Sequence, residues 1–310
     1  MIHTENLTKS FGDHLAVDQL SLDIGDGEVF GFLGPNGAGK TTTIRMLTSL
    51  IAPTSGTARV VGFEVGRDDG QIRRNVGILT ETPGMYDRLS ARRNLTIFAR
   101  LYEVEAVDRQ VEKYLRLLGL WDRRDDPVGE FSKGMRQKLA IARSLLHEPR
   151  VIFLDEPTAA LDPEASRLVH DFITELKGQG RTIFLCTHNL DEADRLCDRV
   201  AVFKTHLHVV DTPGKLRRQV YGRQVAFHLR GAADSFLPLV QGLPFVNQAE
   251  ASEGKLVLAL DEPEARNPEI IRALVGAGAD IQFVGELRYS LEDVYLQLMK
   301  DGEEPVSSIQ

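Results

Sequence analysis

Cysteine is scarce in this sequence of 310 residues, because only Cys186 and Cys197 are present. Two cysteines are too few for a disulfide framework, and without a second pair they do not form a paired-cysteine metal site. We therefore expect both cysteines to be buried free thiols.

Long apolar runs are also missing, since none approaches the ~18 residues that are needed to cross a bilayer. The first residues, Met1 to Asn6, lack the basic and apolar regions of a signal peptide. The chain is therefore expected to stay in the cytosol.

Positive charge is not in excess, because 37 Lys and Arg stand against 45 Asp and Glu, for a formal net charge of -8. This acidic balance argues against wide contact with nucleic-acid phosphates, although a local basic patch stays open. The 42% hydrophobic and 26% charged residues are typical of a globular protein and exclude disorder or fibrous repeats. At ~100–200 residues per domain, the length indicates a main domain and a smaller one.

Short apolar runs predict the strands of a parallel sheet. They occupy residues 28–33, 76–79, 151–154 and 182–186. Because these runs are apolar at consecutive positions, they suit strands that are buried on both faces and covered by helices. Between about 83 and 149 the apolar spacing becomes helical, which indicates a helical insertion into an α/β core.

The chain changes character after about Leu216, where a small α+β region begins. Residues 225–229 and 256–260 are predicted to be strands, and 268–275 a helix. We expect domains at 1–217 and 218–300.

A capped helix is predicted at the end of this region. Ser290 and Asp293 make a capping box, and the residues after Ser290 have helical apolar spacing. One face of this helix carries Leu291, Val294, Tyr295 and Leu298. Residues 301–310 are expected to be a flexible tail.

A glycine-rich loop follows the first predicted strand and fits the Walker A pattern. Its glycines let backbone N–H groups surround phosphates at a helix N-terminus. Lys40 would reach the β- and γ-phosphates of a nucleotide, and the Thr41 hydroxyl would bind Mg²⁺. A turn can match this pattern by chance, but the strand before it and the helix after it favour phosphate binding. The predicted binding residues are Gly34, Pro35, Asn36, Gly37, Ala38, Gly39, Lys40, Thr41 and Thr42.

Two carboxylates end the predicted strand 151–154. Asp155 is the predicted acid on the Mg²⁺ side, as in other P-loop enzymes. Because neighbouring residues at a strand end point in different directions, Glu156 points away from the Asp155 side and can act as a general base toward water. The alternative for Glu156 is a carboxylate that only stabilises a helix N-terminus, but its place next to Asp155 and before Pro157 favours catalysis.

Residues 130–138 (EFSKGMRQK) precede this strand. Ser132 can cap an amphipathic helix, and Lys133 and Arg136 flank its free N–H groups to form an anion site. A capped helix without a ligand is the plainer interpretation. The apolar face of this helix carries Met135, Leu139, Ala142 and Leu146.

This stretch resembles the signature sequence of ABC ATPases, and other motifs match that family in order over roughly residues 1–217. The resemblance implies a P-loop NTPase core of the ABC ATPase type with a helical insertion, followed by a small C-terminal α+β domain. It also implies a dimer of two copies around ATP. Ser132, Lys133 and Gly134 would contact the γ-phosphate that the other subunit holds.

Further site residues are implied by the resemblance alone. Phe11 occupies the place of the aromatic residue that stacks on adenine, although a Phe is more often part of a core. Residues 160–162 resemble the D-loop, so Asp162 would pass between the subunits. His188 resembles the switch histidine that senses the γ-phosphate, and its place after a parallel strand favours this role over a structural one.

Glu81 departs from the family pattern, because most members have a glutamine there that touches Mg²⁺. A carboxylate is still a competent oxygen ligand, directly or through water. Its negative charge beside the γ-phosphate could change metal affinity or rate.

The resemblance implies an ATP-hydrolysing subunit that powers a transporter, with ATP and Mg²⁺ as cofactors. It is similar to stand-alone subunits that pair with a separate permease to export drugs, antibiotics, lipids or polysaccharides. The expected partners are a second copy and an integral membrane permease, with no nucleic acid. The expected place is the cytoplasmic face of the cell membrane. The C-terminal region resembles the extension of exporter subunits, where a packing or dimer-stabilising role is favoured over a sensor.

Two other functions agree less well with the sequence. A soluble ABC ATPase acting on ribosomes or DNA would usually carry two cassettes or a long coiled coil, and neither is present. An ordinary P-loop kinase leaves the signature stretch and His188 unexplained.

Overall fold

The computed structural model describes residues 1–80, 84–159 and 161–301. Its chain forms two compact units, which divide between Thr212 and Pro213. The second unit begins at Pro213 because α8 (Pro213–Tyr221) packs against α11 (Leu291–Asp301). None of the helices in the described ranges combines the length and the apolar character needed to cross a bilayer.

A six-stranded sheet forms the centre of the first unit. Its order is β10-β9-β3-β8-β7-β6, and all neighbours are parallel except β10 and β9. All residues of β3, β7 and β8 are buried, as expected for strands covered on both faces. The predicted parallel sheet is therefore confirmed. Its strands are β3 (Val29–Leu33), β6 (Val76–Leu79), β7 (Val151–Asp155), β8 (Thr182–Thr187), β9 (Arg199–Lys204) and β10 (His206–Asp211).

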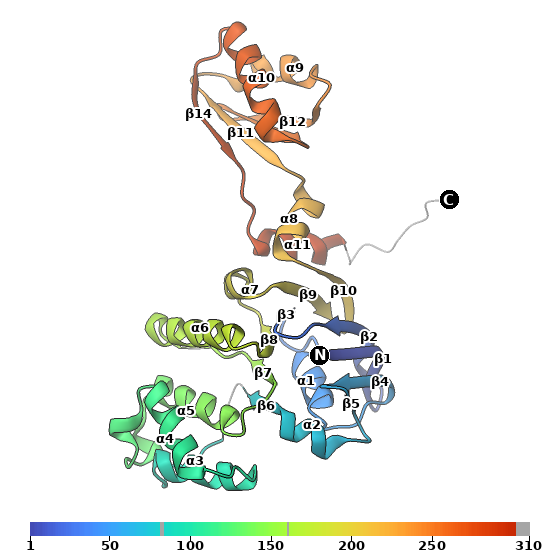
Figure 1. Ribbon diagram of the computed structural model, residues 1–310. Coiled ribbons are helices and arrows are strands. Elements are labelled where there is room, and N and C mark those ends of the chain that lie inside the picture. The colour runs from blue at the N-terminus through green and yellow to red at the C-terminus, as the bar shows by residue number, and fades with distance from the viewer. Residues whose placement is uncertain (81–83, 160, 302–310) are drawn as a thin grey trace. The chain divides into compact units, whose positions relative to one another are not determined.

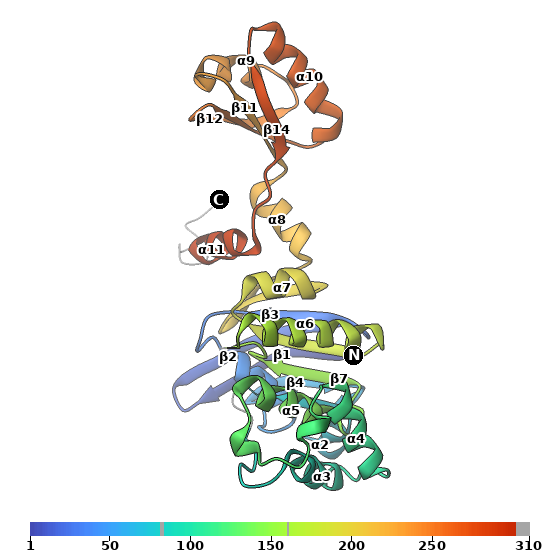
Figure 2. The ribbon, with the colours of Figure 1, turned by 90° about the vertical axis from the view of Figure 1, so that its left-hand side faces the viewer.

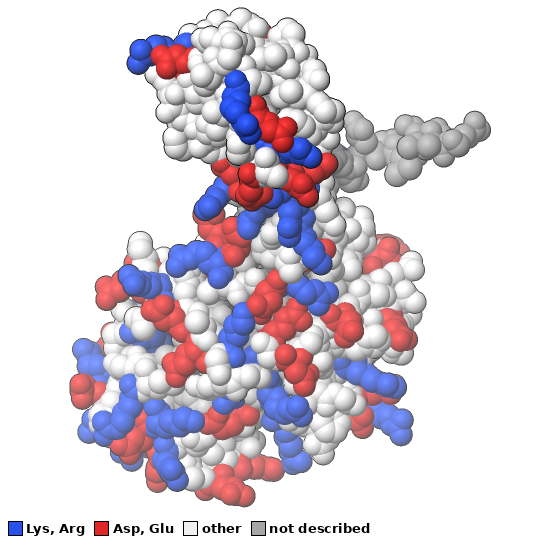
Figure 3. Space-filling view, turned by 45° about the horizontal axis from the view of Figure 1, so that its top comes forward, with Lys and Arg blue, Asp and Glu red and all other residues white. Residues whose placement is uncertain are grey.

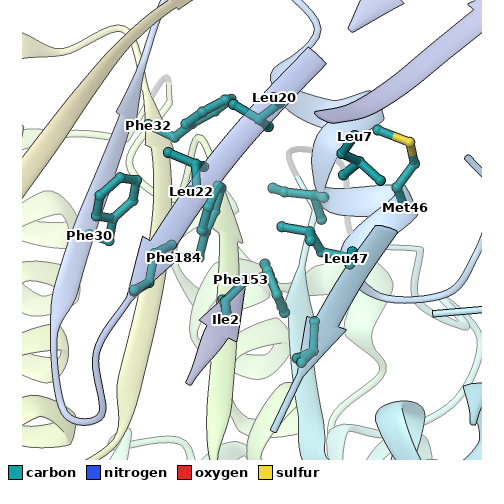
Figure 4. Packing of buried hydrophobic residues seen from close by; sticks show 14 of the residues in the cluster. Ile2, Leu7, Leu20, Leu22, Phe30, Phe32, Met46, Leu47, Phe153 and Phe184 are labelled. Carbon is teal, nitrogen blue, oxygen red and sulfur yellow. The ribbon is translucent and has the colours of Figure 1, made fainter. Parts of the chain in front are cut away.

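An antiparallel sheet, which the sequence analysis did not predict, lies beside the central one. Its order is β2-β1-β4-β5. Figure 4 shows the core between the two sheets, where Phe153 and Phe184 of the parallel sheet face Leu22 and Leu47. The strands are β1 (Ile2–Phe11), β2 (His14–Ile24), β4 (Ser55–Val60) and β5 (Phe63–Glu64).

Three α-helices in the described part of the predicted helical insertion contact one another. Figure 1 shows α3, α4 and α5 gathered into one group, apart from the antiparallel sheet. Their bounds are α3 (Ala91–Leu101), α4 (Val107–Leu117) and α5 (Lys133–Leu145). The other helices of the first unit are α1 (Lys40–Leu47), α2 (Asp69–Asn75), α6 (Pro163–Gly178) and α7 (Leu190–Leu196).

The second unit contains a four-stranded antiparallel sheet in the order β12-β13-β11-β14. Apolar residues of α9 and α10 pack with β11 and β13 in a separate core, and Figure 2 shows these elements grouped together. This is the predicted α+β region. The elements are β11 (Gln224–Leu229), α9 (Leu237–Gln241), β12 (Val246–Ser252), β13 (Lys255–Leu260), α10 (Pro263–Gly276) and β14 (Ile281–Glu286).

Two predictions about helices in this unit have different outcomes. Helix α10 begins at Pro263 and contains Pro268 in its interior, so the predicted start at Pro268 was wrong. A proline fits the first turn because its missing N–H needs no partner there, and Pro263 is the one that occupies this position. The capping box of α11 is confirmed, since Ser290 N donates to Asp293 Oδ2 and Asp293 N to Ser290 Oγ.

Candidate functional site

Three adjacent parallel strands bring the predicted site residues to one edge of the sheet. In the order β3-β8-β7, these strands lead into the glycine-rich loop, into His188 and into Glu156, respectively. Because parallel strands present their carboxyl ends at the same edge, residues far apart in the sequence meet there.

Two glycines of the loop have no room for a side chain. A Cβ on Gly39 would lie 2.3 Å from the carbonyl oxygen of Ala16, and its φ is +103°. A Cβ on Gly34 would lie 2.1 Å from the carbonyl oxygen of Phe203. The loop therefore packs on the backbone of neighbouring strands, which holds its own backbone in position at the start of α1.

A cavity of 320 Å³ opens above this loop. It brings together most of the predicted phosphate-binding residues, Phe11 and both carboxylates. His14 and Ala16 also line it, and no motif in the sequence pointed to them. Its lining residues are Phe11, His14, Ala16, Pro35, Asn36, Gly37, Ala38, Gly39, Lys40, Thr41, Thr42, Asp155 and Glu156.

Lys40 is buried at the floor of this cavity, with 5% of its surface exposed. Its Nζ donates to the carbonyl oxygen of Gly34 at 2.6 Å and to that of Pro35 at 3.3 Å. The same Nζ lies 3.4 Å from Glu156 Oε1. The loop carbonyls and a buried carboxylate therefore hold the ammonium group beside the loop.

Thr41 and Asp155 meet at the cavity, although they are far apart in the sequence. Thr41 Oγ1 donates to Asp155 Oδ2 at 2.7 Å, and Asp155 is buried. Hydroxyl and carboxylate oxygens are hard donors that suit Mg²⁺. The pair therefore fits the predicted metal.

Both cysteines are buried free thiols, as predicted. Burial, together with the nearby charge of Asp155, raises the pKa of the Cys186 thiol.

Glu156 has a strained backbone conformation, and its side chain contacts His188. Its φ is +51°, a region that costs a non-glycine residue on the order of 1–3 kcal/mol. His188 Nδ1 lies 2.8 Å from Glu156 Oε2, and because a carboxylate only accepts, Nδ1 carries the proton. The carboxylate is 9% exposed at the cavity wall. Such a group can orient and deprotonate a water molecule.

The predicted residues of the signature stretch and D-loop lie at two helix N-termini. Ser132 caps α5 by accepting from Met135 N, and Asp162 caps α6 by accepting from Ala165 N. Gly134 faces α6, since a Cβ there would lie 3.3 Å from that of Ala165. Among the described residues, Ser132, Lys133, Gly134 and Asp162 do not line the cavity of their own chain.

Phe11 stands at the rim of the cavity with 50% of its surface exposed. Lys9 Nζ lies 5.1 Å from the centroid of its ring. The alternative that Phe11 belongs to the core is therefore wrong, because an exposed ring beside the loop is available for stacking. Two predicted positions, Glu81 and residue 160 of the D-loop, lie outside the described residues.

Gln137 is a site neighbour that no motif in the sequence indicated. It is 8% exposed, and its Nε2 donates to the carbonyl oxygen of Pro157 at 2.6 Å. This bond ties α5 to the segment that follows Glu156. The signal in the sequence was weak, namely a glutamine among the mostly apolar buried positions of the helix.

The fold and the cavity together define a class of protein, the P-loop ATPases. A model of the ABC transporter family matches residues 17–159. Relatives of full length agree with it, and the chain belongs to this family as an ATP-binding subunit that hydrolyses ATP.

Three relatives are similar to nearly the whole chain. A Nod factor export ATP-binding protein of Rhizobium sp. (strain N33) is 34% identical, with 96% of each chain covered. A bacitracin transport ATP-binding protein of Bacillus licheniformis is 33% identical over 97% of this chain and 98% of its own. A daunorubicin resistance ATP-binding protein of Streptomyces coeruleorubidus is 35% identical over 97% of this chain and 96% of its own.

Solved structures agree on the cassette. An ATP-binding subunit of an ABC transporter has a TM-score of 0.66 and 28% identity, covering 77% of this chain and 98% of its own. A second, cbiO1 from Clostridium perfringens, which is part of the ABC transporter complex cbiONQ, has a TM-score of 0.64 and 27% identity, covering 69% of this chain and 89% of its own. The predicted fold class is confirmed.

Proposed function

We propose that this subunit powers export through a separate membrane permease, as one of two copies that enclose two Mg-ATP molecules. The observation that carries the proposal is the edge of the sheet where the glycine loop, Asp155 and Glu156 line one cavity and His188 contacts Glu156. Relatives of full length that are named for export and drug resistance support the direction of transport.

ATP binding is assigned to the loop and to the rim of the cavity. Backbone N–H groups between Gly34 and Thr42 would surround the phosphates, and Lys40 would turn from the loop carbonyls toward them. Phe11 would stack on the adenine. Thr41 and Asp155 would hold Mg²⁺, which supplies charge neutralisation at the phosphates. Glu81 is proposed as a further oxygen ligand.

Hydrolysis is assigned to Glu156 and His188. Glu156 would take the proton of the attacking water, work worth ~10²–10⁴ in rate. His188 holds this carboxylate through Nδ1 and would reach the γ-phosphate with the other side of its ring. The loss of the γ-phosphate would then open the two copies.

The second copy is proposed to contribute Ser132, Lys133, Gly134 and Asp162. Two observations support a trans role. In the described part of the chain these residues stand outside their own cavity, and Ser132 begins a helix whose N-terminal N–H groups favour an anion.

The helical insertion is the proposed contact with the permease, on the cytoplasmic face of the cell membrane. It exposes the apolar side chains of Tyr86, Leu101 and Leu117. Around it, Figure 3 shows basic and acidic side chains interspersed over the visible face of the first unit.

A purification tests these proposals. The Glu156→Gln variant, supplied with ATP and Mg²⁺, is tagged and isolated from detergent-solubilised native membranes. We expect a stoichiometric multi-span protein to come with it and to be lost when Lys40 is also changed to Ala. Ribosomal or DNA-bound proteins without a membrane partner would contradict the transporter function.

A further inference from the structure

A buried glutamate stands beside the catalytic edge without a role in the function proposed above. Glu192 lies in the first turn of α7 and is 1% exposed. Thr158 Oγ1 donates to its Oε1 at 2.9 Å, and His170 Nε2 donates to the same oxygen at 3.0 Å. Its Oε2 is buried and has no hydrogen-bond partner among the residues that the structure describes.

The three residues of this cluster come from three segments that carry site residues. Thr158 follows Glu156 by two positions. Glu192 belongs to the helix that Asn189 caps, directly after His188. His170 is on α6, which begins at the cap residue Asp162. One carboxylate oxygen therefore joins the segments of the assigned base, the switch histidine and the D-loop.

Simple packing does not account for an acid at this position. A buried carboxylate loses its hydration, and hydrophobic residues of similar volume often give equal or greater stability. Oε1 nevertheless accepts two hydrogen bonds while Oε2 accepts none in the described structure. The two hydrogen bonds to Oε1 of Glu192 thus fix the positions of the Thr158 segment, α6 and α7 relative to one another.

We propose that Glu192 is a positioning residue for ATP hydrolysis. It holds Thr158 against α7 and thereby sets the distance between Glu156 and His188, and through His170 it sets the start of α6. Glu192 does not line the nucleotide cavity, so it acts on turnover and not on binding. The proposal rests on the function proposed above, because it needs Glu156 and His188 to be the groups that are positioned.

Steady-state ATPase assays on three variants test the proposal. Thr158→Val keeps the shape but removes one donor, and we expect kcat to fall about tenfold with KM within about twofold. Glu192→Ala removes the acceptor and should lower kcat at least as much. Glu192→Gln keeps an oxygen that can accept both hydrogen bonds, so kcat should stay within about threefold of the wild-type value. Its NH₂ group takes the place of Oε2, which has no hydrogen-bond partner, so the melting temperature should fall because a buried donor is left unpaired.

A double variant and a control separate positioning from plain destabilisation. Thr158→Val combined with Glu192→Ala should be no slower than Glu192→Ala alone, since the hydroxyl then has no acceptor left to lose. Thr4→Val removes a buried hydroxyl that bonds the backbone of β2. It should lower the melting temperature and leave kcat unchanged.

Three results would overturn the positioning role. The first is an unchanged kcat in Thr158→Val. The second is a kcat loss in the double variant that equals the product of the two single losses. The third is a kcat loss in Thr4→Val that equals that of Glu192→Ala. The proposed function is tested separately by Lys40→Ala. If this variant still turns over ATP at the wild-type rate, the assigned site is wrong, whatever the Glu192 variants do.

Discussion

Glu156 and His188 are expected to act as one unit, and a double-mutant cycle can measure their coupling. The perturbations are His188→Ala, Glu156→Gln and the combination of both. The structural basis is the contact of 2.8 Å between His188 Nδ1 and Glu156 Oε2, with the backbone N of His188 at 3.4 Å from the same oxygen. The assay is steady-state ATP hydrolysis with saturating Mg²⁺.

The magnitudes follow from the nature of this contact. A hydrogen bond to a charged group is worth about 1.5–3 kcal/mol, which corresponds to about 10- to 150-fold in rate. The His188 side chain is 59% exposed, so solvent competes for it and we expect a loss near tenfold. Glu156→Gln removes the base and should cost ~10²–10⁴. The double variant should then be within about threefold of Glu156→Gln.

A matched histidine provides the control. His3 also pairs with a glutamate, at 3.1 Å from Glu5, and its side chain is 52% exposed. His3→Ala should change turnover less than about twofold, because a solvent-exposed pair of this kind contributes little. A double variant about tenfold slower than Glu156→Gln would refute the reasoning, since His188 would then act independently of the carboxylate.

Three further outcomes are expected. Phe184→Ala empties a fully buried ring position and should lower the free energy of unfolding in urea by about 3–5 kcal/mol; Phe283→Ala, at a ring 62% exposed, should cost far less. Gly39→Ala should weaken fluorescent-nucleotide binding by about tenfold or more, because its Cβ collides with the loop's neighbouring backbone. Burial raises the pKa of Glu148, but neighbouring donors outweigh it and lower the value to about 2 from 4.5. The stability that this carboxylate adds should therefore be complete above about pH 4.5 and be lost as the pH falls toward 2. In urea titrations over this pH range, the free energy of unfolding should fall less for Glu148→Gln than for the wild-type protein. An equal loss in both proteins would contradict this assignment.

Four strands of the central sheet, β3, β6, β7 and β8, could be predicted because they are apolar at nearly every position. Strands β9 and β10 were not predicted, since a charged residue or a histidine stands at each of their ends. The antiparallel sheet could not be predicted, since its strands are half exposed and β1 has register shifts against β2 that break the alternation of period two. Strand β12 was missed for the same reason, because all its residues, Val246–Ser252, are exposed or half-buried. A strand that is buried on both faces is easier to recognise in a sequence than a short, irregular amphipathic strand.

The site divides in a similar way. The glycine loop and the carboxylates were predictable because each motif is contiguous and its chemistry is local. Gln137 and Glu192 were not, because their partners Pro157 and Thr158 lie 20 and 34 residues away along the chain. Only the packing of α5 and α7 on the carboxylate segment brings these atoms together.

The order of the strands also has a consequence for synthesis on the ribosome. In the sheet, β3 and β7 do not touch each other, and β8 lies between them. The strand before the glycine loop therefore lacks its two flanking partners until the chain has been made as far as β8 and β9. Because such pairings are distant in sequence, they form slowly and leave apolar edges exposed meanwhile. A nascent chain that stops before Thr182 carries both halves of the nucleotide pocket without the strand that joins them.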